Sequence, residues 1–183
     1  MKCNKDIANA FKHFKKICTH KYWVFYYCRK AGIPLQGLIH DLSKFSPIEF
    51  WEGVKYYQGM SSPIDACKKD KGWSEAWLHH KGRNKHHYEF WMDNFDNGGS
   101  PIEMPMKYKK EMLCDYLGAG RAYYGNGFTF EKEYNWWKVK KNKPITMHPN
   151  DIAFIDKYLT LFYEYEKKGY YIHTIFNLIK GEC

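Results

Sequence analysis

Residues 6–31 read DIANAFKHFKKICTHKYWVFYYCRKA, and Gly32 and Pro34 follow shortly after. Apolar side chains recur in this stretch at helical intervals, at Phe14, Ile17, Val24 and Tyr27. Such spacing is typical of the buried face of an α-helix, and glycine and proline commonly end helices. The stretch therefore predicts one long helix that buries one of its sides.

Helical spacing continues along the rest of the chain. We expect a short apolar helix at 35–43 and further helices at 48–57, from 61 towards 80, and at 86–94, 105–124, 150–168 and 170–180. Residues 97–101 are expected to form a loop, and the lysine-rich residues 138–144 a solvated connection. Because no long alternating pattern of apolar residues is present, the chain is predicted to be all-α.

Length and composition favour one compact helical domain over residues 1–183. The chain has 183 residues, of which 44% are hydrophobic, and it contains no internal repeat. It contains no run of about 18 apolar residues, and its N-terminus lacks the apolar run of a secretory signal, so we expect a cytoplasmic protein. Six scattered cysteines without a C-x-x-C pair are expected to be reduced thiols, mostly in packing roles.

The formal net charge of +9 favours anionic partners. A nucleotide, a nucleic acid or an anionic membrane surface would each fit the charge, and so would a merely solvated basic surface. Charge alone does not choose among these partners; nucleic acid is a candidate partner, and no membrane partner is expected.

A His-Asp pair lies at the end of an apolar run, in Leu38-Ile-His-Asp-Leu-Ser-Lys-Phe45. Burying His40 and Asp41 is costly unless something pairs with them, and a metal ion is a natural partner. By itself the pair is weak evidence for a metal, and a hydrogen-bonded helix end is the favoured interpretation. Two other positions strengthen the metal interpretation. His20 shares a helix face with Ile17 and Val24, and Asp115 shares one with Met112 and Ala119.

A third group of potential ligands is the histidine-rich stretch at 79–87, which contains four of the nine histidines. Dense histidine tracts indicate metal binding, although an exposed basic loop is the alternative. His80 continues an apolar face and His87 begins one, so these two rank ahead of His79 and His86 as candidate ligands. Asn84 is expected to cap a helix.

The order of these residues, all on expected helices, resembles the HD-domain phosphohydrolase superfamily. The string His-Asp-Leu-Ser-Lys-Phe at 40–45 is similar to its His-Asp-x-x-Lys signature, and residues 35–60 and 77–91 resemble an uncharacterised bacterial family of this kind. The resemblance covers about residues 10–125, which would be the metal-binding core, with 126–183 as a C-terminal helical extension. The chain departs from the common two-metal pattern by crowding the middle histidines into one segment.

The resemblance implies one or two divalent transition-metal ions. His20, His40, Asp41 and Asp115 would hold the first ion, and Asp41 with His80 and either His86 or His87 would hold the second. Mixed histidine and carboxylate ligands suit Mn²⁺, Fe²⁺, Co²⁺, Ni²⁺ or Zn²⁺. Lys44 would contact substrate phosphate. Arg83, Lys85 and Arg121 lie near the candidate ligands in sequence and are further candidates for phosphate binding, with solvent-exposed positions as the alternative.

The resemblance implies hydrolysis of a small phosphorylated substrate, a nucleotide-type phosphomonoester or phosphodiester that includes cyclic or dinucleotide signals. Metal-activated water would attack the phosphate, with Asp41 and Lys44 as the catalytic residues. Two alternatives stay open. One is a di-iron oxygenase that uses the same ligand set. The other is a nucleic-acid-binding module with a structural metal, which the charge and the aromatic pairs Tyr22-Trp23 and Trp136-Trp137 would suit.

Overall fold

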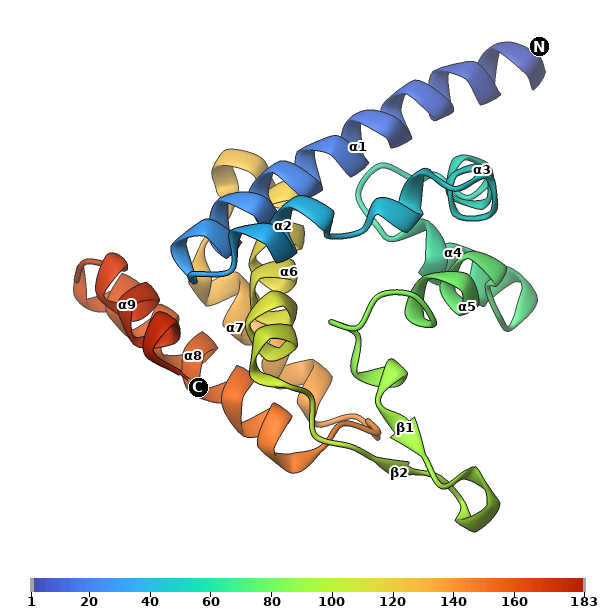
Figure 1. Cartoon of the computed structure of the whole chain (residues 1–183). Helices are drawn as coiled ribbons and strands as arrows, with labels where there is room; N and C mark the ends of the chain where they lie inside the picture. The colour runs from blue at the N-terminus through green and yellow to red at the C-terminus, as the bar shows by residue number, and fades with distance from the viewer. Residues whose placement is uncertain (1, 183) are drawn as a thin grey trace.

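Two long helices, α1 (Lys2–Lys30) and α6 (Met106–Tyr124), form the most extensive helix pair of the molecule. In the computed structural model, α1 runs across one side of the molecule and α6 lies beneath its C-terminal half (Figure 1). The structure describes residues 2–182, with side chains from residue 6. It is 73% helical, which confirms the all-α prediction.

Close contact between α1 and α6 depends on one glycine. A Cβ added to Gly118 would lie 2.5 Å from Cγ2 of Val24 and 3.0 Å from its backbone nitrogen. Ile17, His20 and Val24 are all buried, as expected for one face of α1. Phe14, which we assigned to the same face, is instead 47% exposed because it lies on the flank of the helix. The two helices therefore bring His20 and the middle of α6 together.

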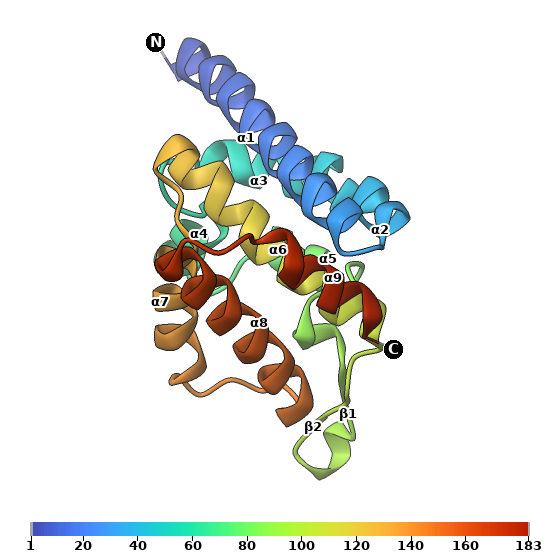
Figure 2. The same cartoon turned by 90° about the vertical axis from the view of Figure 1, so that its left-hand side faces the viewer.

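Seven further helices lie among the described residues. They are α2 (Pro34–Ile39), α3 (Pro47–Lys55), α4 (Pro63–Lys71), α5 (Glu75–Lys81), α7 (Phe130–Lys141), α8 (Pro149–Lys168) and α9 (His173–Gly181). Short 3₁₀ turns are η1 (Leu42–Phe45), η2 (Tyr88–Phe90), η3 (Phe95–Asn97) and η4 (Gly125–Gly127). Strands β1 (Met92–Asp93) and β2 (Ser100–Pro101) form a small antiparallel hairpin that projects from the helical body (Figures 1 and 2).

The helix predicted from residue 61 towards 80 is wrong as one element. Gly72 adopts a left-handed conformation, with φ of 83°, and ends α4. Ser74 then begins α5, because its hydroxyl accepts a hydrogen bond from the backbone N–H of Trp77. The apolar pattern in the sequence continues across this break because each of the two helices buries apolar residues of its own, Cys67 in α4 and Ala76 in α5.

The helix predicted at 86–94 is also wrong. His87 is extended, with φ of −88° and ψ of 126°, and Asn94 is left-handed, with φ of 58°. Between them lie only the η2 turn and β1, and the expected loop at 97–101 contains β2. Residues 86 and 87 are held by the side chains around them, which a local helical pattern does not represent.

Helix α7 was not predicted, and part of it was assigned to a solvated connection. Lys138 and Lys141 lie in the last turn of α7. Thr129 caps its start by accepting from the N–H of Lys132, and Trp137 is fully buried. The stretch was not predicted as a helix with a buried side because its many lysines make it appear fully solvated in the sequence.

The C-terminal helices pack onto the same apolar core as α1 and α6. The ring of Phe130 in α7 stacks on Phe162 of α8 at 4.8 Å, and Tyr27 of α1 stacks on Phe176 of α9 at 5.9 Å. Figure 2 shows α8 and α9 lying across α6 on the side away from α3. One buried apolar cluster therefore joins both ends of the chain.

Within the described part of the chain, none of the helices combines the length and the apolar character needed to cross a membrane. Cys18, Cys28, Cys67 and Cys114 are free thiols, and all but Cys18 are buried. Cys183 and the side chain of Cys3 lie outside the described residues.

Candidate metal centre

The His-Asp pair lies where α2 ends and η1 begins. Asp41 has φ of 54° and ψ of 28°, a left-handed conformation that costs energy for any residue with a Cβ. Strained backbone of this kind clusters at functional sites, where surrounding contacts hold it in place. The unusual turn places the side chains of His40 and Asp41, each 1% exposed, in the interior beside α1, α5 and α6.

His20, His40, Asp41 and Asp115 form the first group of potential ligands. Nε2 of His20 lies 3.4 Å from Oδ2 of Asp41 and 3.1 Å from Oδ1 of Asp115. Nε2 of His40 lies 3.2 Å from the same Asp41 oxygen and 3.4 Å from the same Asp115 oxygen. Four donor atoms from three separate segments therefore converge on one point.

Asp41, His80, His86 and His87 form the second group. Nε2 of His80 lies 3.3 Å from Oδ1 of Asp41, and Nε2 of His86 lies 3.4 Å from the same oxygen. The ring of His87 is 4.8 Å from that of His80 and 4.2 Å from that of His86, centre to centre. Asp41 thus directs one carboxylate oxygen to each group.

Several of these atoms are buried without a hydrogen-bond partner among the described residues. They are Nε2 of His86, Nε2 of His87 and both carboxylate oxygens of Asp41, whose close contacts are ion pairs. Unsatisfied buried polar atoms are rare in native proteins because each costs about 1–3 kcal/mol. Their convergence fits bound cations, and the mixed nitrogen and oxygen donors suit divalent transition metals.

Two carboxylates orient the histidines from behind. Oε2 of Glu49 lies 2.7 Å from Nδ1 of His80, and Oε1 of Glu111 lies 2.9 Å from Nδ1 of His40 and 3.1 Å from Nδ1 of His86. A proton on each Nδ1 would leave Nε2 free as a ligand, which is the usual arrangement of metal-binding histidines. The second oxygen of Glu49 contacts Nδ1 of His79 at 2.6 Å, so His79 supports the site without joining either group.

Neither glutamate was predicted as a site residue. Glu49 lies in the first turn of α3, and its pairing with His80, 31 residues away, leaves no local pattern. Glu111 lies one helical turn before Asp115 on α6, so its spacing could have placed it beside the site. His86, ranked below His87 on periodicity, has the better defined contacts because residues 86 and 87 are not helical.

The charges of this centre depend on one another. Burial alone would lower the pKa of His40, but the carboxylates of Asp41, Asp115 and Glu111 raise it well above the usual range. Burial would raise the pKa of Glu111, but its two histidine partners lower it to about 2. The carboxylates likewise raise the pKa of His80, whereas burial lowers the pKa of His86 and of His87. In the absence of a cation, His40 and His80 therefore carry the positive charge that keeps these carboxylates ionised.

Lys44 is the predicted phosphate contact that the structure brings to the centre. Its Nζ lies 2.6 Å from Oδ2 of Asp41. Burial would lower the pKa of Lys44, but the adjacent carboxylates, Asp41 foremost, raise it to about 12. The amine is therefore a stable positive charge at the edge of the first group.

The other predicted phosphate contacts lie elsewhere. Arg83 is exposed and its guanidinium is 3.4 Å from the carbonyl of His79, and exposed Lys85 lies over the ring of Phe90. Arg121 contacts the hydroxyl of Tyr27 and packs between aromatic rings.

Asn84 does not begin a helix, as was predicted. Its side-chain amide donates to Ser43 Oγ at 2.8 Å and to the His80 carbonyl at 2.9 Å.

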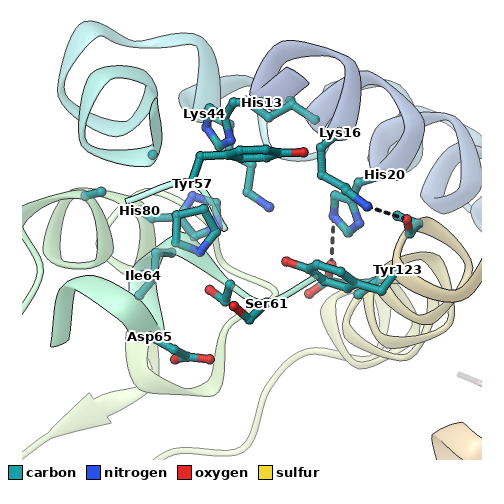
Figure 3. Close-up of a pocket in the computed structure, with 18 of the residues that line it drawn as sticks. His13, Lys16, His20, Lys44, Tyr57, Ser61, Ile64, Asp65, His80 and Tyr123 are labelled. Atoms are coloured by element: carbon teal, nitrogen blue, oxygen red, sulfur yellow. Dashed lines mark hydrogen bonds and ion pairs between the residues drawn. The ribbon is translucent and has the colours of Figure 1, made fainter. Parts of the chain in front are cut away.

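A cavity of about 500 Å³ opens beside the two groups. It is lined by His20, His80, His87 and Asp115 from the candidate centre, and Lys44 and Lys16 add positive charge. In Figure 3, Tyr57 and Tyr123 face this cavity from opposite sides, with Lys16 and His20 on the α1 side between them. The candidate metal centre is therefore accessible to a small molecule.

Comparison with known proteins identifies one family. Residues 9–161 match the family described as "Family of unknown function (DUF5662)". No curated protein and no solved structure matches the chain.

Proposed function

The chain belongs to the DUF5662 family, and from its site we propose that it is a metal-dependent phosphohydrolase acting on a nucleotide-type phosphomonoester or phosphodiester. The order of His20, His40-Asp41, the histidines at 80–87 and Asp115 resembles the HD-domain superfamily, and this resemblance supports the proposal. The proposed fold is accordingly an HD-type helical core with additional C-terminal helices.

The observation that carries the proposal is that Asp41 belongs to both groups of ligands. Its Oδ2 lies 3.2–3.4 Å from Nε2 atoms of the first group, and its Oδ1 lies 3.3–3.4 Å from Nε2 atoms of the second group. A carboxylate shared in this way is suited to two adjacent cations. Asp115 would complete the first ligand set, and His86 and His87 would complete the second.

When bound, divalent ions would lower the pKa of a water molecule towards 7 and would offset negative charge on the phosphoryl oxygens. In the proposed reaction a water oxygen bonds to phosphorus while the ester P–O bond breaks, and the departing oxygen takes a proton. Lys44, held beside Asp41, would contribute a positive charge to a phosphate that enters from the cavity. The tyrosines at the cavity would face the rest of the substrate.

The test is metal content together with turnover. Asp41→Asn is the informative variant, because asparagine also tolerates the left-handed backbone while it removes the shared charge. We expect the wild type to bind up to two transition-metal equivalents and to hydrolyse p-nitrophenyl phosphate or bis(p-nitrophenyl) phosphate. In Asp41→Asn we expect the loss of bound metal and a fall in kcat of at least about 10³-fold.

Asp70→Asn is a matched control, since Asp70 is exposed and bonds to Tyr56 away from the centre. A wild type that cannot be loaded with any of the five candidate metals would contradict the proposal. Oxygen consumption by the iron-loaded protein without hydrolysis of either ester would contradict it too and would favour the oxygenase. Salt-sensitive oligonucleotide binding that Asp41→Asn retains, without turnover, would favour the nucleic-acid-binding module.

A further inference from the structure

Helix α7 carries a buried carboxyl group that faces the cavity and is not a candidate metal ligand. The side chain of Glu133 is 5% exposed and lines the cavity. Among the described residues it makes no hydrogen bond and no ion pair. A buried carboxyl without a hydrogen-bond partner is disfavoured, so a ligand in the cavity that donates N–H groups would stabilise it.

Glycine in α6 makes room for this carboxyl. A Cβ added to Gly120 would lie 2.3 Å from Oε2 of Glu133, so the carboxyl lies directly against the helix backbone. Gly120 follows Asp115 by five residues, or about 7 Å along the helix axis. Glu133 therefore lies beside the candidate metal centre but outside both ligand groups.

The surroundings of Glu133 change its pKa. Burial, and then the negative charge of Asp115, raise its pKa to about 8, while Lys140 opposes the change. The Nζ of Lys140 is directed to the hydroxyl of Tyr116, at 3.2 Å, and does not pair with Glu133. The carboxyl is thus left with hydrogen-bonding capacity directed into the cavity.

Aromatic rings form much of the surrounding wall. Tyr116 and Trp136 line the cavity with ring centres 5.0 Å apart, and Trp77 lines it as well. Tyr57 and Tyr123 face each other across it (Figure 3). Aromatic faces of this kind bind planar rings by stacking, which contributes affinity without specificity for one ring over another. Specificity must then come from polar groups. Glu133 and His13 are two cavity-lining residues outside the ligand groups that lack a hydrogen-bond partner among the described residues.

We propose that Glu133 is a specificity-determining residue which hydrogen-bonds the N–H groups of a planar, nucleobase-like ring carried by the substrate. The inference rests on the proposed function, in that the phosphate of the same molecule would lie at the metal groups beside Lys44. The C-terminal part of the chain would therefore recognise the organic half of the substrate, while the histidine and aspartate groups act on the phosphate.

The test compares substrates that share the phosphate and differ in the ring. The metal-loaded full-length protein is assayed with the 5′-monophosphates of adenosine, guanosine, cytidine and uridine, and with p-nitrophenyl phosphate, whose ring has no N–H. We expect at least one nucleotide to exceed p-nitrophenyl phosphate in kcat/KM. In Glu133→Leu we expect that advantage to fall about tenfold or more, with p-nitrophenyl phosphate changed less than twofold.

Glu133→Gln retains hydrogen bonding and is expected to keep part of the advantage. Glu131→Leu, on the exposed side of the same helix, is the matched control and should behave as wild type. Equal losses for all substrates in Glu133→Leu would indicate a structural role and overturn the proposal. An unchanged nucleotide preference in that variant would overturn it as well.

Equilibrium binding of the four nucleosides separates this inference from the proposed function. If no phosphate ester is hydrolysed, the phosphohydrolase proposal fails. Nucleoside binding that weakens about tenfold in Glu133→Leu would still support a role for Glu133 in recognising the ring. Failure of the wild type to bind any of the four nucleosides would overturn that role.

Discussion

At the scale of single residues, the candidate centre depends on the backbone conformation of Asp41 and on two glutamates that contact the histidines. Asp41 accepts a left-handed backbone, and its two oxygens then reach two separate sets of histidines. Behind the histidines, Glu49 and Glu111 accept from Nδ1 atoms and leave Nε2 atoms directed at Asp41. Each of these two carboxylates therefore orients a different set of histidine ligands.

We predict that Glu49→Gln weakens binding at the second group and spares the first. Glu49 contacts His79 and His80, and none of its hydrogen bonds or ion pairs among the described residues involves His20, His40 or Asp115. Loss of such an orienting carboxylate typically lowers metal affinity by 10–100-fold. Titration with Zn²⁺ or Mn²⁺ followed by calorimetry should show one weakened site and one unchanged site.

The control for this experiment is Glu75→Gln, an exposed glutamate in the first turn of α5. It should bind metal as the wild type does. Equal weakening of both sites in Glu49→Gln, or no change in either, would contradict the assignment of Glu49 to the second group.

At the scale of the elements, the spacing between helices decides whether ligands on different helices lie within reach of one cation. His20 lies on α1 and Asp115 on α6, and the two helices pack closely where Gly118 meets Val24. Since Gly118 lies three residues from Asp115, a change in helix spacing there is transmitted to the first ligand group. Packed interiors resist such changes, because there are few voids to absorb an added methyl group.

We predict that Gly118→Ala destabilises the protein and weakens the first metal site. The added Cβ would lie 2.5 Å from Cγ2 of Val24, and overpacking of this kind costs about 1–3 kcal/mol. Thermal unfolding with and without metal should show a lower Tm and a smaller stabilisation by metal. Gly127→Ala is the control, since its added Cβ would meet only Nζ of Lys132, at 3.8 Å. A wild-type Tm for Gly118→Ala would show that α1 and α6 are not held at this spacing.

In the whole molecule, the candidate ligands come from α1, the α2–η1 turn, α5, the segment before η2, and α6. Cations at this centre would therefore bridge segments that are up to 95 positions apart in sequence, from His20 to Asp115. Their binding would be coupled to folding, because the ligands come together only in the folded chain.

We predict that removal of metal by a chelator lowers the Tm by roughly 10 °C. Saturation at about 1,000 times Kd stabilises a protein by about 4 kcal/mol. For a chain of this size, each kcal/mol shifts Tm by about 2–4 °C. Scanning calorimetry before and after chelation and reloading measures the effect. Asp41→Asn should show no such shift, and an equal shift in that variant would place the stabilising ion elsewhere.

Local patterns in the sequence were sufficient to predict the all-α class, the long first helix and most of the helices that follow it. They also indicated His20, His40, Asp41, His80 and Asp115 as inward-facing polar residues. Helical periodicity is a property of neighbouring residues, so it can be detected without knowing which helices pack together. The same local signal was misleading at 86–94, where long-range contacts hold an irregular segment, and at 130–141, where lysines conceal a buried tryptophan.

The division of these residues into two groups around Asp41 depends on the packing of the folded chain, and so does their support by Glu49 and Glu111. The same packing places Glu133 at the cavity and Arg83, Lys85 and Arg121 away from it. The pairings involved join residues 20 to 95 positions apart, from His20 with His40 to His20 with Asp115. Such contacts are set by the packing of helices against one another, which depends on the shape of the whole core and leaves no periodic pattern in the chain.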